Sequence, residues 1–121
     1  MRPDPAEIER IARMSQGDDR PHWLDDVLQS YDLDPEAGIL VEYDEVEDQG
    51  ATLCHGTWLT TSREFWSFEV WVREDGSEPR VEVVENITTM TSLATDIPGI
   101  GKSFGAVALD VLGTVLPGRP H

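Results

Sequence analysis

The first third of the chain carries apolar residues at helical spacing. Asp4 can cap a helix N-terminus, and the proline after it suits the first helical position. The pattern breaks at Gly17, and Pro21 can begin a second helix. We therefore predict a pair of helices within residues 4–33. Their apolar positions are Ile8, Ile11 and Ala12 in the first helix and Trp23, Leu24, Val27, Leu28 and Tyr31 in the second.

From residue 38 onward the pattern changes to the alternation of apolar and polar residues that is typical of β-strands. Turn-forming residues separate the runs, for example Asp48-Gln49-Gly50 and Asp75-Gly76-Ser77. The gaps between runs are short, whereas a parallel crossover needs about a dozen residues or more. We therefore predict a four-stranded antiparallel meander within residues 38–90.

The predicted turns determine which residues share a face of this sheet. We expect a three-residue loop at Asp48-Gln49-Gly50, closed by glycine in the left-handed conformation, and an even-numbered loop at Thr61-Ser62. A slip of one residue would move every side chain of a strand to the opposite face. The face expected to contact the helices contains Ile39, Val41, Tyr43, Leu53, His55, Thr57, Trp66, Phe68, Val70, Val72, Val81, Val83 and Ile87.

The second face of the predicted sheet mixes aromatic rings with carboxylates, besides Leu40, Cys54 and Val84. A solvated sheet face is normally polar, so large rings there need a cause. Either the C-terminal helix covers them, or the rings anchor a partner while the carboxylates attract its basic groups. The candidate partner-binding residues are Trp58, Phe65 and Trp71 as anchors, with Glu42, Asp44, Glu69 and Glu82 as charges.

A last apolar stripe predicts a C-terminal helix over residues 100–116, which Pro117 ends. Its polar side holds only Lys102 and Asp110, which does not suit binding to an anionic membrane surface. Core packing or contact with a second copy is the expected role. The predicted fold class is therefore α+β, with an N-terminal helical pair, a four-stranded antiparallel meander and a C-terminal helix in a single domain over residues 1–121.

The net charge of the chain limits the classes of molecule that it can bind. The 121 residues include 24 acidic and 9 basic side chains, for a formal net charge of −15. Lys102 is the only lysine, so direct binding to nucleic-acid phosphates, which needs clustered cations, is excluded. No apolar run is long enough to span a membrane, and the N-terminus lacks the apolar region of a secretory signal. The single cysteine, Cys54, is typical of a reducing cytoplasm.

The sequence contains no complete catalytic or metal-binding motif. Cys54 and His55 are neighbours in a predicted strand, so they point to opposite faces and do not share one ion. Gly101-Lys102-Ser103 matches the end of a phosphate-binding loop, but Asp96 stands where that motif requires glycine. We therefore expect no metal, no cofactor and no enzymatic activity.

These observations favour a non-catalytic, acidic protein-binding module that recognises a basic partner surface, a description that immunity proteins, inhibitors and chaperones share. One alternative is a homo-oligomer that associates through the sheet face or the C-terminal helix, with acidity serving solubility. Another is an inhibitor whose carboxylates mimic nucleic-acid phosphates. An enzyme is the least favoured class.

Overall fold

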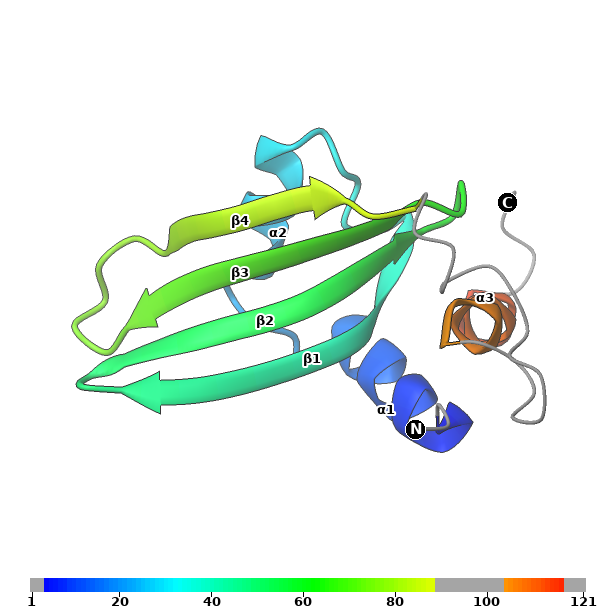
Figure 1. Ribbon diagram of the computed structural model, residues 1–121, viewed down its shortest axis with the longest axis horizontal. Coiled ribbons are helices and arrows are strands. Elements are labelled where there is room, and N and C mark those ends of the chain that lie inside the picture. The colour runs from blue at the N-terminus through cyan, green and yellow to red at the C-terminus, as the bar shows by residue number, and fades with distance from the viewer. Residues whose placement is uncertain (1–3, 89–103, 117–121) are drawn as a thin grey trace.

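The computed structural model describes residues 4–88 and 104–116 (Figure 1). Its four strands form one antiparallel sheet in the order β1-β2-β3-β4. The predicted α+β fold, with an N-terminal helical pair, a four-stranded antiparallel meander and a C-terminal helix, is confirmed. The elements are α1 (Pro5–Ser15), α2 (Leu24–Ser30), β1 (Gly38–Asp48), β2 (Ala51–Thr60), β3 (Phe65–Arg73), β4 (Arg80–Asn86) and α3 (Phe104–Val115).

Helix α1 begins and ends with side-chain hydrogen bonds. The carboxylate of Asp4 accepts from the backbone N–H of Ala6 at 3.0 Å, which caps the helix as the sequence predicts. At the other end the buried Ser15 hydroxyl donates to the Ala12 carbonyl oxygen at 2.6 Å and accepts from the Leu40 backbone N–H at 3.1 Å. Ser15 therefore connects the end of α1 to the start of β1.

Helix α2 buries most of the apolar stripe predicted for it. Leu24, Val27 and Leu28 are buried, and Trp23 at the N-cap is also buried. Tyr31 lies just beyond the helix and is exposed. The stripe thus turns one side of α2 toward the sheet, where these side chains and Leu33 form a core with Leu40, Cys54, Trp58, Phe68, Val70 and Ile11 of α1.

Helix α3 lies at the end of the sheet where β1 begins (Figure 1). Of the predicted range, residues 104–115 are helical, and residues 100–103 lie outside the described part of the chain. Its apolar side packs against α1 and the sheet in a second core, so this end of the sheet is covered on both faces. That core contains Ile8, Ala12, Ile39, Val41, Leu59, Phe65, Val107, Ala108, Val111 and Leu112.

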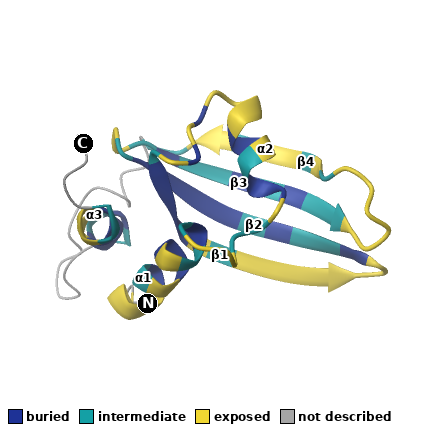
Figure 2. Cartoon of the chain, turned by 180° about the vertical axis from the view of Figure 1, so that it is seen from behind, coloured by how far each residue is buried: buried dark blue, intermediate teal, exposed yellow. Residues whose placement is uncertain are grey.

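The other end of the sheet is covered on one face only. Seen from behind in Figure 2, α2 lies over the strands, α1 lies beside the start of β1, and the buried positions run along β2 and β3. The half of β1 that approaches the turn is exposed. This difference between the two ends decides which residues a partner can reach.

Both tight turns differ from the predicted ones by one residue. Asp48 pairs with Ala51, so the β1–β2 loop has only two residues, Gln49 (φ 49) and Gly50 (φ 81). Two positive φ angles in succession are the signature of a type I′ hairpin turn, and the expected three-residue loop is wrong.

At the β2–β3 connection the difference is reversed. Leu59 pairs with Phe65, and the Thr60 backbone N–H donates to the Glu64 carbonyl oxygen at 2.9 Å. The loop therefore has three residues, 61–63, with Arg63 in the left-handed conformation (φ 69), and the expected even-numbered loop is wrong.

Bulges in two strands also change which side chains share a face of the sheet. The pairing of β1 with β2 shifts between Leu40 and Glu42, which leaves Val41 as an extra residue. Glu82 is the extra residue on β4, because Val81 pairs with Val70 and Val83 pairs with Glu69. Side chains that simple alternation assigned to one face therefore lie on the other beyond each bulge.

Candidate functional site

Two of the three predicted anchors are buried. Trp58 is 0% exposed and lies on the face that contacts α2, across from Leu40 and Trp66. Phe65 is 4% exposed beneath α1 and α3. The expectation that these rings stand uncovered beside Trp71 is therefore wrong, and neither is available to a partner in this conformation. The alternative, in which the C-terminal helix covers the second face, holds for Phe65 at one end of the sheet.

Trp71 is half-buried and does lie on the side of the sheet away from α2, together with three of the predicted charges. We call this region the open face, because no helix of the described residues packs over it. Its cross-strand rows are Glu42–Thr57–Ser67–Glu85, Asp44–His55–Glu69–Val83 and Val46–Leu53–Trp71–Arg80.

The first two rows of the open face concentrate negative charge. Glu42 and Glu85 end one row, and Asp44 and Glu69 lie in the next. Glu42 Oε1 accepts from the buried Thr57 hydroxyl at 3.3 Å and lies 3.8 Å from His55 Nδ1. The pair with Thr57 fixes this carboxylate on the face, where it is still largely exposed.

The third row provides apolar surface. Val46 is 61% exposed and Val83, in the adjacent row, is 38% exposed, although both are aliphatic. Between them lie the half-buried Leu53 and Trp71. Apolar side chains that reach solvent next to one another are what protein-binding surfaces present.

The Trp71 end of the open face is locally basic. Trp71 lines a hollow of about 220 Å³ together with Asp48, Arg73 and Arg80. Arg80 forms an ion pair with Glu82, the bulge residue. The predicted role of Glu82 as a free steering charge is therefore not supported, since its carboxylate is already paired within the chain.

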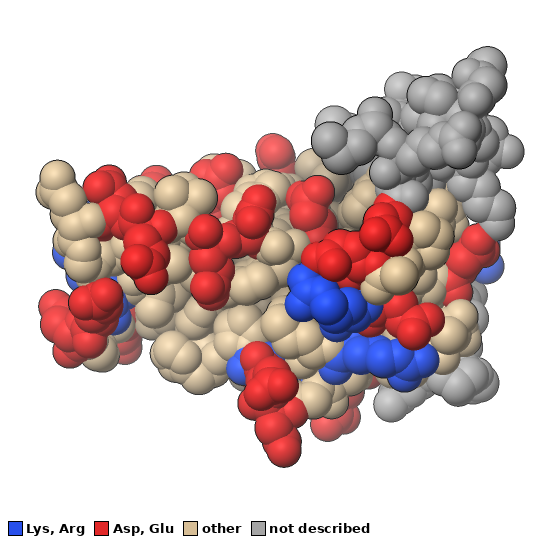
Figure 3. All heavy atoms as spheres, turned by 90° about the horizontal axis from the view of Figure 1, so that it is seen from below, with Lys and Arg blue, Asp and Glu red and all other residues tan. Residues whose placement is uncertain are grey.

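The outer edge of β1 adds further carboxylates. Residues 42–48 contain five acidic side chains, and the other two residues are Tyr43 and Val46. Figure 3 views this edge: Asp and Glu spheres follow it toward the β1–β2 turn, whereas the larger group of Lys and Arg spheres lies over the end that carries α1. On α1, Arg10 and Arg13 pair with Glu7 and Glu9. The acids of β1 receive no arginine partner among the described residues.

Cys54 is not a reactive site in this arrangement. Its side chain is buried, and burial raises the pKa of the thiol, so it stays protonated at neutral pH. His55 points to the opposite face, as expected for neighbours in a strand. Within residues 4–88 and 104–116, no group of three His, Cys, Asp or Glu side chains is placed to hold a metal ion. The Gly101-Lys102-Ser103 segment lies outside the described residues.

No helix in the described part of the chain is long and apolar enough to cross a membrane. Comparison of the chain with protein-family models, with curated proteins and with solved structures found no match.

Sequence reasoning missed several members of the open face, namely Val46, Leu53, His55, Val83 and Glu85. Leu53, His55 and Val83 were expected on the helix side. The signal that identifies them is the two-residue turn: if Gln49 and Gly50 alone form the loop, Leu53 pairs with Val46 and shares a face with Trp71. The bulge at Glu82 then brings Val83 to the same side.

Proposed function

We propose that this protein is a non-catalytic binding module whose open face recognises a basic surface of another protein. The observation that carries the proposal is the composition of that face, in which solvent-accessible apolar side chains lie next to carboxylates in successive cross-strand rows. Apolar area supplies contact surface, while a negative field speeds encounter and fixes the register of a basic partner.

The arrangement of charges also describes the partner. Lysine or arginine side chains would face Glu42, Asp44 and Glu69, since these carboxylates are exposed or partly exposed. An apolar side chain would lie against Leu53 and Trp71. Trp71 takes the anchoring role that the sequence assigned to three rings, because it is the one of the three that remains accessible.

Self-association through the open face is the weaker alternative. Two copies meeting face to face would bring like charges of the first two rows together, and like-charge contacts across an interface are unfavourable. A basic partner instead neutralises them. Mimicry of nucleic acid belongs to the same binding class and predicts that duplex DNA competes for the partner.

The test compares two triple variants with the same change in net charge. Glu42→Gln, Asp44→Asn and Glu69→Gln neutralise the open face, whereas Asp18→Asn, Asp32→Asn and Glu36→Gln neutralise exposed acids in the segments before and after α2. Partners captured by the immobilised protein are purified, and their Kd is measured by biolayer interferometry at about 50 mM and about 300 mM salt. If each lost contact contributes about 0.5–1 kcal/mol, the open-face variant loses about tenfold or more in affinity.

The control variant should stay within about threefold of the original protein, because only long-range attraction changes. Trp71→Ala should weaken binding as well while leaving the fold intact. Equal losses in the two triple variants would show that the attraction is unspecific. Binding that neither added salt nor Trp71→Ala alters would overturn the proposal.

A further inference from the structure

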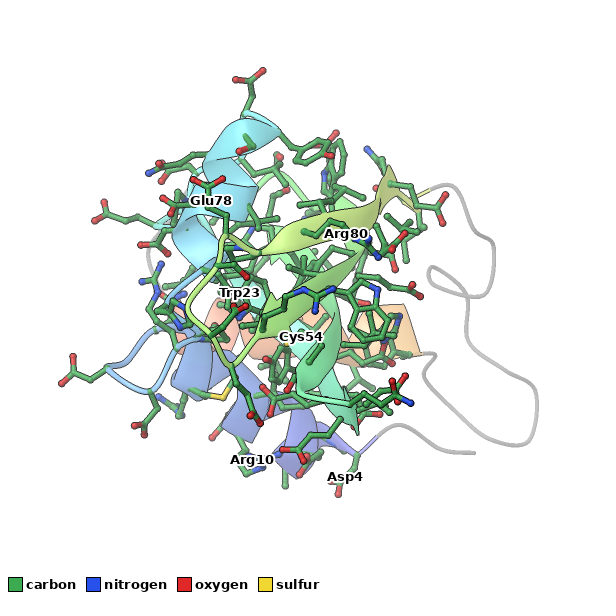
Figure 4. All side chains as sticks on the ribbon, turned by 90° about the vertical axis from the view of Figure 1, so that its left-hand side faces the viewer. Asp4, Arg10, Trp23, Cys54, Glu78 and Arg80 are labelled. Carbon is green, nitrogen blue, oxygen red and sulfur yellow. The ribbon has the colours of Figure 1, made fainter. Side chains whose placement is uncertain are left out.

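A pocket of about 350 Å³ lies on the other side of the sheet from the open face. One wall comes from the α1–α2 connection, with Asp19 and Trp23, and the other from the sheet, with Tyr43 and Glu45 of β1 and Cys54 of β2. Its volume is at the lower end of the range of about 300–1,000 Å³ found for small-molecule sites. Figure 4 shows Trp23 on the side of the sheet where α1 and α2 lie.

Two aromatic rings are held in place at this pocket. The ring centroids of Trp23 and Tyr43 are 6.5 Å apart with an interplanar angle of 32°. Trp23 also contacts Phe68, whose ring meets it edge-on at a centroid distance of 5.9 Å. Aromatic faces attract organic cations through the negative charge distribution above the ring, and most strongly where water is partly excluded.

A carboxylate is positioned beside these rings. The Tyr43 hydroxyl donates to Glu45 Oε2 at 2.6 Å, which orients the carboxylate at the mouth of the pocket. Burial raises the pKa of Tyr43, so the hydroxyl keeps the proton that this hydrogen bond requires. Asp19 supplies a second carboxylate from the opposite wall, and the residues that line the pocket include His22 but no lysine or arginine.

This combination selects the ligand chemistry. Two carboxylates repel anions, and a purely apolar ligand would gain nothing from them. A bare metal ion would need more ligands than the site offers, in agreement with the missing metal cluster among the described residues. An organic cation satisfies both features, since its charge meets the carboxylates and its weakly hydrated body meets the rings.

A neighbouring pocket of about 290 Å³ provides a comparison. It lies on another side of Trp23, lined by Asp26 and Glu78 as well as Pro79, and Figure 4 shows Glu78 near α2. It also has two carboxylates, but it contains only one aromatic ring and neither acid is held by a tyrosine hydroxyl. The pocket lined by Trp23 and Tyr43 is therefore the better cation site of the two.

We propose that the pocket lined by Trp23 and Tyr43 binds a small organic cation with an alkylammonium or guanidinium head. The site is separate from the open face and does not depend on the function proposed for it. Tyr43, together with the small part of Trp23 that reaches the pocket (4% exposed), contacts the body of the cation, and Glu45 and Asp19 neutralise its charge.

The experiment is an NMR titration of the ¹⁵N-labelled protein with choline and with ethylguanidinium. A neutral analogue of choline, 3,3-dimethylbutan-1-ol, in which carbon replaces the charged nitrogen, serves as the ligand control. The four tryptophan indole N–H signals report on the site, because Trp23 lines the pocket while Trp58, Trp66 and Trp71 do not. We expect saturable shifts at Trp23 on the order of millimolar Kd for at least one of the two cations.

Two variants on one strand make the test specific. Glu45→Gln should weaken binding about threefold or more, whereas Glu47→Gln, two residues further along the same face of β1, removes the same charge without touching the pocket and should change little. Both positions are exposed, so the folded spectrum should be retained.

Shifts that do not saturate, or that the neutral analogue reproduces, would overturn the proposal. Equal effects of Glu45→Gln and Glu47→Gln would also overturn it, because they would reduce the site to general attraction by the acidic surface.

Discussion

Trp58 and Trp71 provide the sharpest test of the strand register, because the sequence alone treats them as equivalent rings on one face. Trp58 is fully buried between the sheet and α2, and replacing a buried tryptophan by alanine costs about 3–5 kcal/mol. The Trp58 indole N–H has no hydrogen-bond partner among the described residues, and removing an unsatisfied buried donor returns about 1 kcal/mol. Trp58→Ala should therefore lower the free energy of unfolding by roughly 2–4 kcal/mol.

Trp71→Ala should cost about 1 kcal/mol or less, because this ring is only half-buried on the open face and leaves no enclosed cavity. Urea denaturation followed by far-ultraviolet circular dichroism measures both variants without relying on tryptophan fluorescence. With an m-value of about 1.5 kcal/mol/M, the midpoint should fall by about 1.3–2.7 M for Trp58→Ala and by less than about 0.7 M for Trp71→Ala. Equal losses, or a larger loss at Trp71, would refute the register described above.

Two further predictions concern the core. Gly56→Ala should cost about 1–3 kcal/mol, because the added Cβ would come within 2.6 Å of Phe68 Cζ and 3.0 Å of the Glu42 carbonyl oxygen. Gly113→Ala, where the added Cβ has no atom within 4 Å, should be neutral or stabilising in a thermal melt. The reverse order of stabilities would contradict this packing. Burial raises the pKa of Cys54 above its ordinary value of 9.0, so the unfolded chain loses this proton first and stability should fall as pH rises past about 9. Urea midpoints from pH 7 to about pH 10 should decline less steeply for Cys54→Ala, and parallel declines would assign the loss to other groups.

The helices could be predicted from sequence because each has a local cause. Asp4 and the proline after it specify the start of α1, and the apolar stripe of α2 identifies its buried side. The number and order of strands also followed from alternation and turn residues. These features depend on neighbours along the chain, which is the information that a single sequence contains.

The candidate site was harder to predict because it depends on whether each hairpin loop has an even or an odd number of residues. Asp48-Gln49-Gly50 suits either a two-residue or a three-residue loop, and the choice reverses the face of every residue in the next strand. Arg63 adopts a left-handed conformation that glycine usually takes, and the bulges at Val41 and Glu82 have no local signature. Trp58 was therefore assigned to the wrong face. Phe65 does share the face of Trp71 with the carboxylates of Glu42, Asp44 and Glu69, as expected, but it is buried beneath α1 and α3.

The acidic half of β1 also governs how copies of this chain behave toward each other. β1 is the longest strand of the described residues and forms an outer edge of the sheet, so its backbone offers an open template for continued pairing. Because ionised side chains line that edge, a second chain approaching in the same way meets repulsion before any ladder can form. The safeguard against fibre-like growth is thus electrostatic rather than steric.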